Sequence, residues 1–310
     1  MSANVETMFY VGERNKPWHG LGECVKDAPT SEDALRLAGL DWEVLQTPIY
    51  TNHGKIDGIK ANVRNTDKSV LGVVSDRYRI IQNTEAFSFT DELLGKGVTY
   101  ETAGSLQGGK KVWLLARLPR EYIIAGERIS PYLVFSNTHD GSGAVRVAIT
   151  PIRVVCNNTL NLALSTAPRS FSIIHTGEIK NKIEEAKQTL FMADKYMENL
   201  GREFEKLRNQ QMTTQQVDEY IKLLLPIEDD ASATTQKNIM RLRADMSARY
   251  YNAPDLKTLG HNAYRFINAV SDFATHAEPI RKTKNYQENL FMKTYEGNPL
   301  IDRAYQLVAA

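Results

Sequence analysis

The sequence predicts an α+β protein, in which a central antiparallel or mixed sheet is followed by a helical C-terminal half with one long heptad helix. Between about residues 42 and 154, short segments rich in Val, Ile, Tyr and Trp alternate with turn residues, as strands do. Most of these segments lie too close together for crossover helices, which excludes a βαβ array. After residue 165, apolar residues recur at helical spacing instead.

The N-terminal third is expected to combine strands with two helices. Thr30 precedes a helical pattern over 31–38 that Gly39 ends. Strands are expected at 42–50, 55–65 and 69–74. Asn83 is placed to cap a second helix, which the glycines at 95 and 97 stop.

A hairpin and a strand–turn–strand unit follow. Residues 98–106 and 110–118 form the hairpin around a Gln-Gly-Gly turn, and more strands are expected at 122–125 and 132–136. The stretch 135–164 predicts a strand, a Gly-rich turn, a strand, a polar break and a helix. Asn157, Asn158 and Thr159 occupy that break, where a helix N-terminus would favour an anion.

The C-terminal half begins with apolar residues spaced alternately by three and four. They are Ile183, Ala186, Leu190, Ala193, Met197, Leu200, Phe204 and Leu207. This seam predicts either packing within the chain or self-association, for which Leu190, Met197 and Phe204 would be the contacts. Three further helices and a last short helix after Pro299 complete an organisation of three regions. These are an arm and short helix over 1–45, a sheet-rich core over 46–175 and a helical region over 176–310.

Composition indicates an ordinary soluble globular protein. The hydrophobic fraction is 42% and the charged fraction 24%, and no apolar run approaches the roughly 20 residues that a membrane span needs. The first residues lack the apolar core of a secretory signal. Cys24 and Cys156 have no sequence neighbour to pair with, so reduced thiols and a cytoplasmic location are expected. We therefore expect no membrane partner.

Positive charge is concentrated in the strand-rich middle. Residues 110–182 hold 10 Lys and Arg against 4 Asp and Glu, whereas residues 1–109 hold 11 against 15. Such a local field can attract a polyanion although the formal net charge of the whole chain is only +1. A solvated sheet face is the alternative explanation.

Cations interleaved with aromatic residues in this region predict a single-stranded nucleic-acid interface. The charges would follow phosphates and the rings would stack on bases. The candidate residues are Lys110, Lys111, Arg117, Arg146 and Arg153 for phosphates, Asn157, Asn158 and Thr159 as hydrogen-bond donors, and Trp113, Tyr132 and Phe135 for stacking. Alternatively, each of these aromatic side chains belongs to the hydrophobic core. A second basic cluster, Lys237, Arg241, Arg243 and Arg249, follows one predicted helix and is either a further contact or a solvated face.

Catalytic signatures are absent from the sequence. It has neither a GxxxxGK[ST] phosphate loop nor a GxGxxG turn, and no two of its six histidines lie within five residues of each other. His139 and Asp140 are the one candidate pair for a metal-dependent hydrolase or nuclease, but THDGSG is also ordinary Asp-Gly turn chemistry. We therefore expect neither an enzyme nor a cofactor.

The segment Pro17-Trp18-His19-Gly20-Leu21-Gly22 is unusual within a polar arm. Trp18 can be buried when the arm folds over, and the glycines permit close backbone approach. Trp18 and His19 are therefore expected to anchor the arm within the subunit or onto a neighbour, with ligand contact as the alternative.

Three segments together resemble the phage/plasmid-like protein family, a domain of unknown function found on bacteriophages, plasmids and integrated elements. They are PWHGLG at 17–22, LGVVSDRYRIIQNTEAFSF at 71–89 and HDGSGAVRVAITPIRVVCNNTLNLAL at 139–164. The resemblance implies a mobile-element protein in a bacterial cytoplasm and transfers no catalytic residue. The order of hairpins and helix over 98–165 is also similar, more weakly, to the single-strand annealing recombinases, which assemble into rings or filaments on DNA.

These observations predict a phage- or plasmid-encoded, oligomerising protein that binds single-stranded DNA and promotes strand annealing in recombination. The alternative is a non-enzymatic factor that binds a host protein and modulates a defence or replication system. A metal-dependent hydrolase or nuclease is the third possibility.

Overall fold

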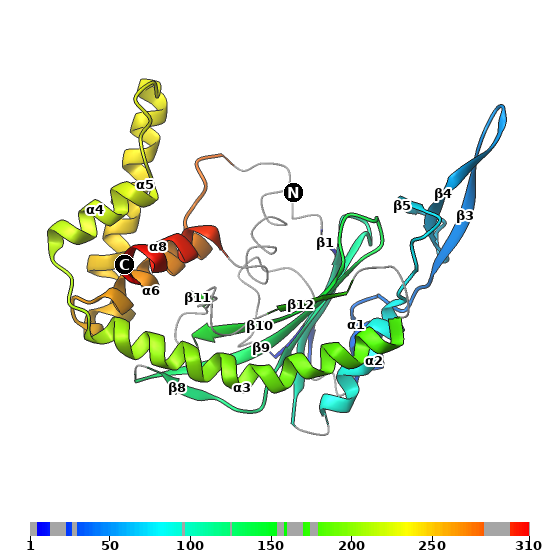
Figure 1. The fold of residues 1–310 in the computed structure, drawn as a ribbon, viewed down its shortest axis with the longest axis horizontal. Helices are drawn as coiled ribbons and strands as arrows, with labels where there is room; N and C mark the ends of the chain where they lie inside the picture. The colour runs from blue at the N-terminus through cyan, green and yellow to red at the C-terminus, as the bar shows by residue number, and fades with distance from the viewer. Residues whose placement is uncertain are drawn as a thin grey trace. The chain divides into compact units, whose positions relative to one another are not determined.

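The computed structural model describes residues 5–12, 23–26, 30–94, 97–124, 126–153, 158–159, 170–173, 179–281 and 298–309 (Figure 1). Side chains are described for most of these residues, but not for 152–192. The chain divides into two compact units. The first comprises residues 1–120, 132–149 and 170–192, and the second comprises residues 121–131, 150–169 and 193–310.

The predicted α+β class is confirmed. The larger sheet has the strand order β11-β10-β9-β7-β6-β1-β2, to which β12 is added beside β10 and β8 beside β9. The parallel pairing of β1 with β2 makes this sheet mixed, whereas the β6–β7–β9 part is antiparallel. Its strands are β1 (Val5–Val11), β2 (Glu23–Val25), β6 (Thr99–Leu106), β7 (Lys111–Arg117), β8 (Tyr122–Ile124), β9 (Glu127–Thr138), β10 (Val145–Arg153), β11 (Asn158–Thr159) and β12 (Ser170–Ile173).

A second, antiparallel sheet has the order β3-β4-β5, with β3 over Val44–Thr51, β4 over Gly54–Arg64 and β5 over Val70–Ser75. Figure 1 shows the three strands side by side. The β3–β4 hairpin extends beyond β5, because β5 pairs only with residues 59–63 of β4. A register shift between Asn62 and Val63 leaves Leu71 as an extra residue on β5.

Two helices belong to the first unit. α1 (Ser31–Leu37) begins where the Thr30 side chain accepts from the Asp33 backbone N–H, and Gly39 follows it with φ +64°. α2 (Asn83–Leu94) begins at the predicted residue, but Asn83 does not cap it. Its side chain donates to the Leu40 carbonyl and accepts from His139 instead, because Asn83 is buried among these groups.

The predicted C-terminal helical region is also confirmed. α3 (Ile179–Asn209) is the expected long helix, and α4 (Thr214–Leu224) starts with a capping box between Thr213 and Gln216. They are followed by α5 (Ala233–Asn252), the 3₁₀ helix η2 (Pro254–Leu259), α6 (Ala263–His276) and α8 (Pro299–Ala309). Leu259, expected in the helix that became α6, lies in η2, because Asn262 caps a new helix after Gly260.

One predicted helix start is wrong. Asn158 and Thr159 form the short strand β11, which pairs antiparallel with Arg153 and Ile152 of β10. The backbone of Asn158 and Thr159 is therefore that of a strand antiparallel to β10 and not of a helix N-terminus. The predicted continuation to residue 164 lies outside the described residues.

Candidate nucleic-acid interface

The strand register brings four of the predicted binding residues onto one face of the large sheet. Lys111, Trp113 and Arg117 alternate along β7, so they share a face. Tyr132 of β9 is directly opposite Arg117 and therefore shares that face too. Phe135 is opposite Leu114 and lies on the other face. We call Lys111, Trp113, Arg117 and Tyr132 the cationic face.

Arg117 is the most exposed member of the cationic face, and it is already paired with a carboxylate. Its Nε lies 3.2 Å from Oε1 of Glu101, and its side chain remains 45% exposed. Burial raises the pKa of the Glu101 carboxyl above its usual value, and the Arg117 charge offsets part of this rise. Because Glu101 contacts Nε, the two terminal amino groups of Arg117 have no partner among the described residues, and they are the groups that form a fork with phosphate.

The aromatic candidates differ in exposure. Trp113 and Phe135 are both buried, and Phe135 makes an edge contact with Phe87 of α2 at 5.0 Å between ring centroids. A base could reach either ring only if the core opened. Tyr132 is half-buried and is the one candidate ring at the surface of the first unit.

The remaining predicted phosphate contacts are distributed over β10 and the β6–β7 turn. Lys110 and Lys111 are half-buried at the start of β7, and Arg146 is half-buried in β10, opposite Ser172 of β12. Arg153 ends β10 opposite Asn158, and the side chains of Arg153, Asn158 and Thr159 lie outside the described ones, as do Asn157, Trp18 and His19 altogether. The binding roles of all these residues stay predictions.

The heptad seam is packed within the second unit wherever its side chains are described. Met197, Leu200, Phe204 and Leu207 are all buried, and the Phe204 ring lies 5.0 Å from that of Tyr264 in α6. Met197 and Phe204 therefore face their own chain in this conformation. The Leu190 side chain lies outside the described residues.

The second basic cluster is mostly occupied by contacts inside the second unit. Arg249 is bound by Asp245 at 3.1 Å and by Asp272 at 2.5 Å, and Arg243 donates to the Leu225 carbonyl. Lys237 and Arg241 are exposed on α5 and have no ion-pair partner among the described residues. They are the two members of this cluster that a phosphate backbone could still reach.

His139 lies in a buried polar network of the first unit. Its Nε2 is 2.9 Å from Oδ1 of Asn83, which must be the acceptor because the Asn83 amide nitrogen donates to Leu40. The Trp42 ring packs edge-on against His139 at 5.3 Å, and the Asn62 amide donates to the His139 carbonyl at 2.7 Å. These contacts place the fully buried His139 ring in the core of the first unit, where Nε2 has a hydrogen-bond partner.

Asp140 shows turn chemistry. Its Oδ1 accepts from the Ser142 backbone N–H at 2.9 Å, and Gly141 follows with φ +78°. Among the described residues, no group of three or more His, Cys, Asp or Glu side chains is arranged to hold a metal ion. The pair His139 and Asp140 therefore has the surroundings of a hairpin corner.

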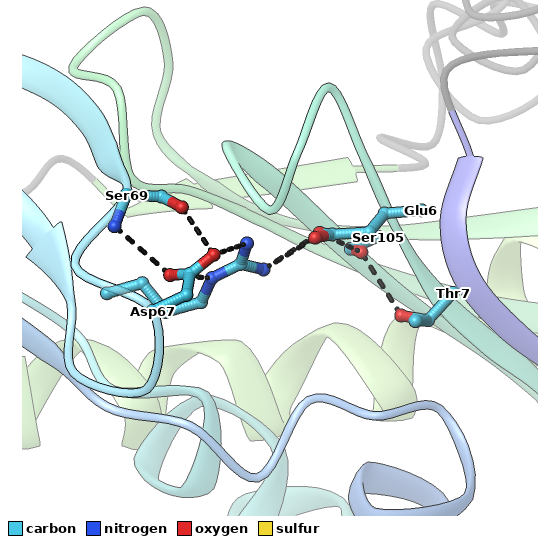
Figure 2. Close-up of polar contacts among 6 residues, drawn as sticks. Glu6, Thr7, Asp67, Ser69 and Ser105 are labelled. Atoms are coloured by element: carbon cyan, nitrogen blue, oxygen red, sulfur yellow. Dashed lines mark hydrogen bonds and ion pairs between the residues drawn. The ribbon is translucent and has the colours of Figure 1, made fainter.

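The sequence did not point to a buried arginine network beside this corner. Arg64 is held by Glu6 at 2.8 Å and by Asp67 at 2.7 Å, and its guanidinium lies 5.4 Å from the centre of the Trp42 ring. Figure 2 shows how Asp67 is also bound by Ser69, while Glu6 reaches Ser105 and, through it, Thr7. Only the spacing of Arg64 and Asp67 across a turn could have suggested part of it.

Two further features were also missed, one buried and one on the surface. Glu101 was one acidic residue in a predicted strand, and nothing in its spacing marks it as the partner of Arg117. Leu45, Val70 and Val73 were assigned to strands, yet they are exposed. The alternation of β-branched residues shows that these segments are strands but does not show which face meets solvent.

Comparisons with known proteins place the chain in a family. Curated proteins and solved structures gave no match. None of the helices that the structure describes is both long and apolar enough to cross a bilayer. Residues 70–293, most of the chain, match the family described as "Domain of unknown function (DUF932)". This match starts at β5 and extends past α6, and the protein is a member of that family.

Proposed function

We propose that this protein binds single-stranded DNA, with the cationic face of its large sheet as the contact surface. The observation that carries the proposal is the direct cross-strand pairing of Arg117 with Tyr132, which sets a guanidinium fork beside a half-buried ring at the surface. In a single strand, the guanidinium can bind a phosphate while the adjacent ring stacks on the neighbouring base. Lys111 on the same face would extend the contact along the strand.

The wider setting agrees with this proposal. The chain's positive excess lies in the segment that forms this part of the sheet. The resemblance to phage/plasmid-like proteins favours a role in bacterial mobile-element recombination, in which binding would promote annealing between strands. The protein would then act in the bacterial cytoplasm, as an oligomer and without catalytic chemistry.

The direct test is fluorescence anisotropy with a labelled oligo-dT strand and with the matched duplex. Wild-type protein should bind the single strand at about 50 mM salt and lose affinity as salt rises to about 200 mM, because binding releases counterions. Arg117→Ala should flatten the slope of log affinity against log salt by about 0.7, the value for one lost phosphate contact on a single strand. Arg36→Ala is the matched control, because Arg36 is also an exposed arginine held by one carboxylate.

Tyr132 provides a second, independent readout. Tyr132→Ala should weaken binding roughly 5- to 150-fold, which corresponds to the usual 1–3 kcal/mol of one base stack, while Tyr132→Phe should retain the affinity. The salt slope should be the same in both variants. Absence of binding at low salt, or equal affinities of Arg117→Ala and Arg36→Ala, would rule out this surface.

A second candidate function is favoured by a different observation. Large apolar side chains are exposed on β3 and β5, which is typical of proteins that bind other proteins. A host-protein-binding factor that modulates defence or replication would show little affinity for oligonucleotides even at low salt. The anisotropy titration therefore separates the two functions.

A further inference from the structure

The β3–β4–β5 sheet has an apolar face that is open to solvent. Leu45 of β3 is opposite Val63 of β4, and Val63 is opposite Val70 of β5, so these three residues form one row across the sheet. Thr47, Ala61 and Val73 form the next row on the same face. We call these six residues the outer face.

The exposure of the outer face is high on its two edge strands, β3 and β5, whereas Ala61 of the central strand β4 is buried. Leu45 is 43% exposed, Val70 58% and Val73 54%. The other large hydrophobic residues exposed outside this sheet, among those described, are Ile123, Leu223, Met240 and Ile280, which lie on separate elements. Scattered single residues are normal, whereas contiguous rows of β-branched residues mark a contact surface.

The charges of this sheet argue against a polyanion as the occupant. Between residues 43 and 76, the cations Lys55, Lys60, Arg64 and Lys68 are balanced by Glu43, Asp57, Asp67 and Asp76. Lys55 lies near Asp57, Lys60 lies near Asp76, and Arg64 is bound by Asp67. A sheet without net charge neither attracts phosphates nor repels a copy of itself.

The geometry points to a second copy of this chain as the occupant. The outer face is a three-stranded surface without charged side chains, and such surfaces pack face to face at about 10 Å. A two-fold axis lying between the two sheets and parallel to β4 would set the β3 side of one copy against the β5 side of the other, so Leu45 would meet Val70. A second copy presents the same apolar rows, so the two surfaces match each other in size and polarity.

We infer that the outer face of β3–β4–β5 is the surface through which two copies of this protein associate. The inference stands apart from the DNA proposal, because the association needs no nucleic acid. Each of the two proposals can therefore fail while the other holds.

Sedimentation velocity without DNA, from about 1 to about 100 µM protein, tests the inference, since a dimer is governed by mass action. Wild-type protein should sediment as a dimer at the upper end. Val73→Lys should raise the dissociation constant at least about tenfold, because the axis would bring two ammonium groups into an apolar contact. Ile123→Lys is the matched control, since Ile123 is 72% exposed and lies outside this sheet.

Val70→Thr tests the same face in case the lysine variant does not fold, because threonine keeps the shape and strand preference of valine. It should weaken the dimer less than Val73→Lys does, and the circular dichroism spectrum should be unchanged. A wild-type monomer at about 100 µM overturns the inference and leaves a foreign protein as the occupant. A dimer that Val73→Lys and Ile123→Lys weaken equally, or not at all, overturns it as well.

Discussion

The two faces of the β3–β4–β5 sheet depart from those of an ordinary half-exposed sheet, in which polar side chains face water and apolar ones face the core. The inner face buries Asn62 and Arg64 between Val44 and Val74. The outer face exposes Leu45, Val70 and Val73. The contrast teaches that burial alone does not determine residue type: the inner polar groups are tolerated because each has specific partners, and the outer apolar groups of the edge strands remain exposed in the described chain.

The partners on the inner face come both from the small sheet and its turn and from distant parts of the chain. Arg64 is bound by Glu6 of β1 and by Asp67 of the β4–β5 turn. Asn62 accepts from Gln46 at 3.3 Å and donates to the His139 carbonyl. The inner face therefore joins the small sheet to the β9–β10 corner through hydrogen bonds that water would otherwise supply.

Arg64→Ala should break this arrangement with the largest effect. It removes the counter-ion of Glu6 and Asp67 and the cation above Trp42, and it leaves a cavity beside Gly109. We expect a loss of about 3 kcal/mol in the free energy of unfolding, at the low end for broken buried pairs because both carboxylates are partly solvated. Urea unfolding followed by circular dichroism measures it. Arg36→Ala, at an exposed pair, should change the same quantity by less than about 0.5 kcal/mol. Equal losses in the two variants would contradict the role of Arg64.

Asn62→Ala should have a smaller but clear effect. The His139 carbonyl would lose a buried donor and could not recover it from solvent, since both residues are fully buried. A buried group left without its hydrogen bond costs about 1–3 kcal/mol, so we expect about 2 kcal/mol. Thr47→Ala, on the outer face of the neighbouring strand, is the control in the same urea titration and should be close to neutral. A neutral Asn62→Ala would mean that the corner does not depend on this bond.

A fall in pH should reduce the stability that the ion pairs of the inner face contribute, because this face contains the Asp67 carboxylate. Hydrogen bonds from Arg64 and then from Ser69 hold the pKa of the Asp67 carboxyl well below its usual value. A carboxylate with a lowered pKa stabilises the fold above the unfolded-state pKa of about 3.9, and this contribution is lost as pH falls from there through the folded-state value. Wild-type stability should therefore fall more steeply below pH 4 than that of Asp67→Asn. Parallel curves from urea midpoints measured at several pH values would contradict this.

Val73→Thr should have the smallest effect on folding. Because Val73 is more than half exposed, replacing a methyl by a hydroxyl leaves no buried polar group, and the unfolding free energy should change by less than about 0.5 kcal/mol. The measurement should be made at a protein concentration where the chain is monomeric, since association would add to the apparent stability. A loss as large as that of Asn62→Ala would show that the outer face is covered by its own chain.

Much of the fold could be predicted because the signals are local. The Thr30 cap and the turn at Gln107 to Gly109 depend on residues within a few positions of each other, and the structure has both. The prediction was wrong at Asn158, where the same residues that favour a helix cap form a strand paired with β10. Pairing between segments supplied hydrogen bonds that local preference had assigned to a helix.

For the candidate interface, the sequence predicts which residues take part but not which of them become neighbours across strands. Alternation along β7 places Lys111, Trp113 and Arg117 on one face, which a strand assignment alone implies. That Tyr132 joins them, and that Phe135 does not, depends on the β7–β9 register. The pairing of Arg117 with Glu101 depends on the β6–β7 contact and has no sequence signal.

By itself the sequence determined most of the strands and helices, the cap at Thr30, and the gathering of positive charge in the middle of the chain, because propensity, capping and charge act over a few neighbouring residues. The tertiary structure alone decided which side of each strand faces water. Burial depends on which other segments cover a face: Glu6 and His139 meet the inner face of β3–β4–β5, and the described chain leaves Val70 and Val73 exposed.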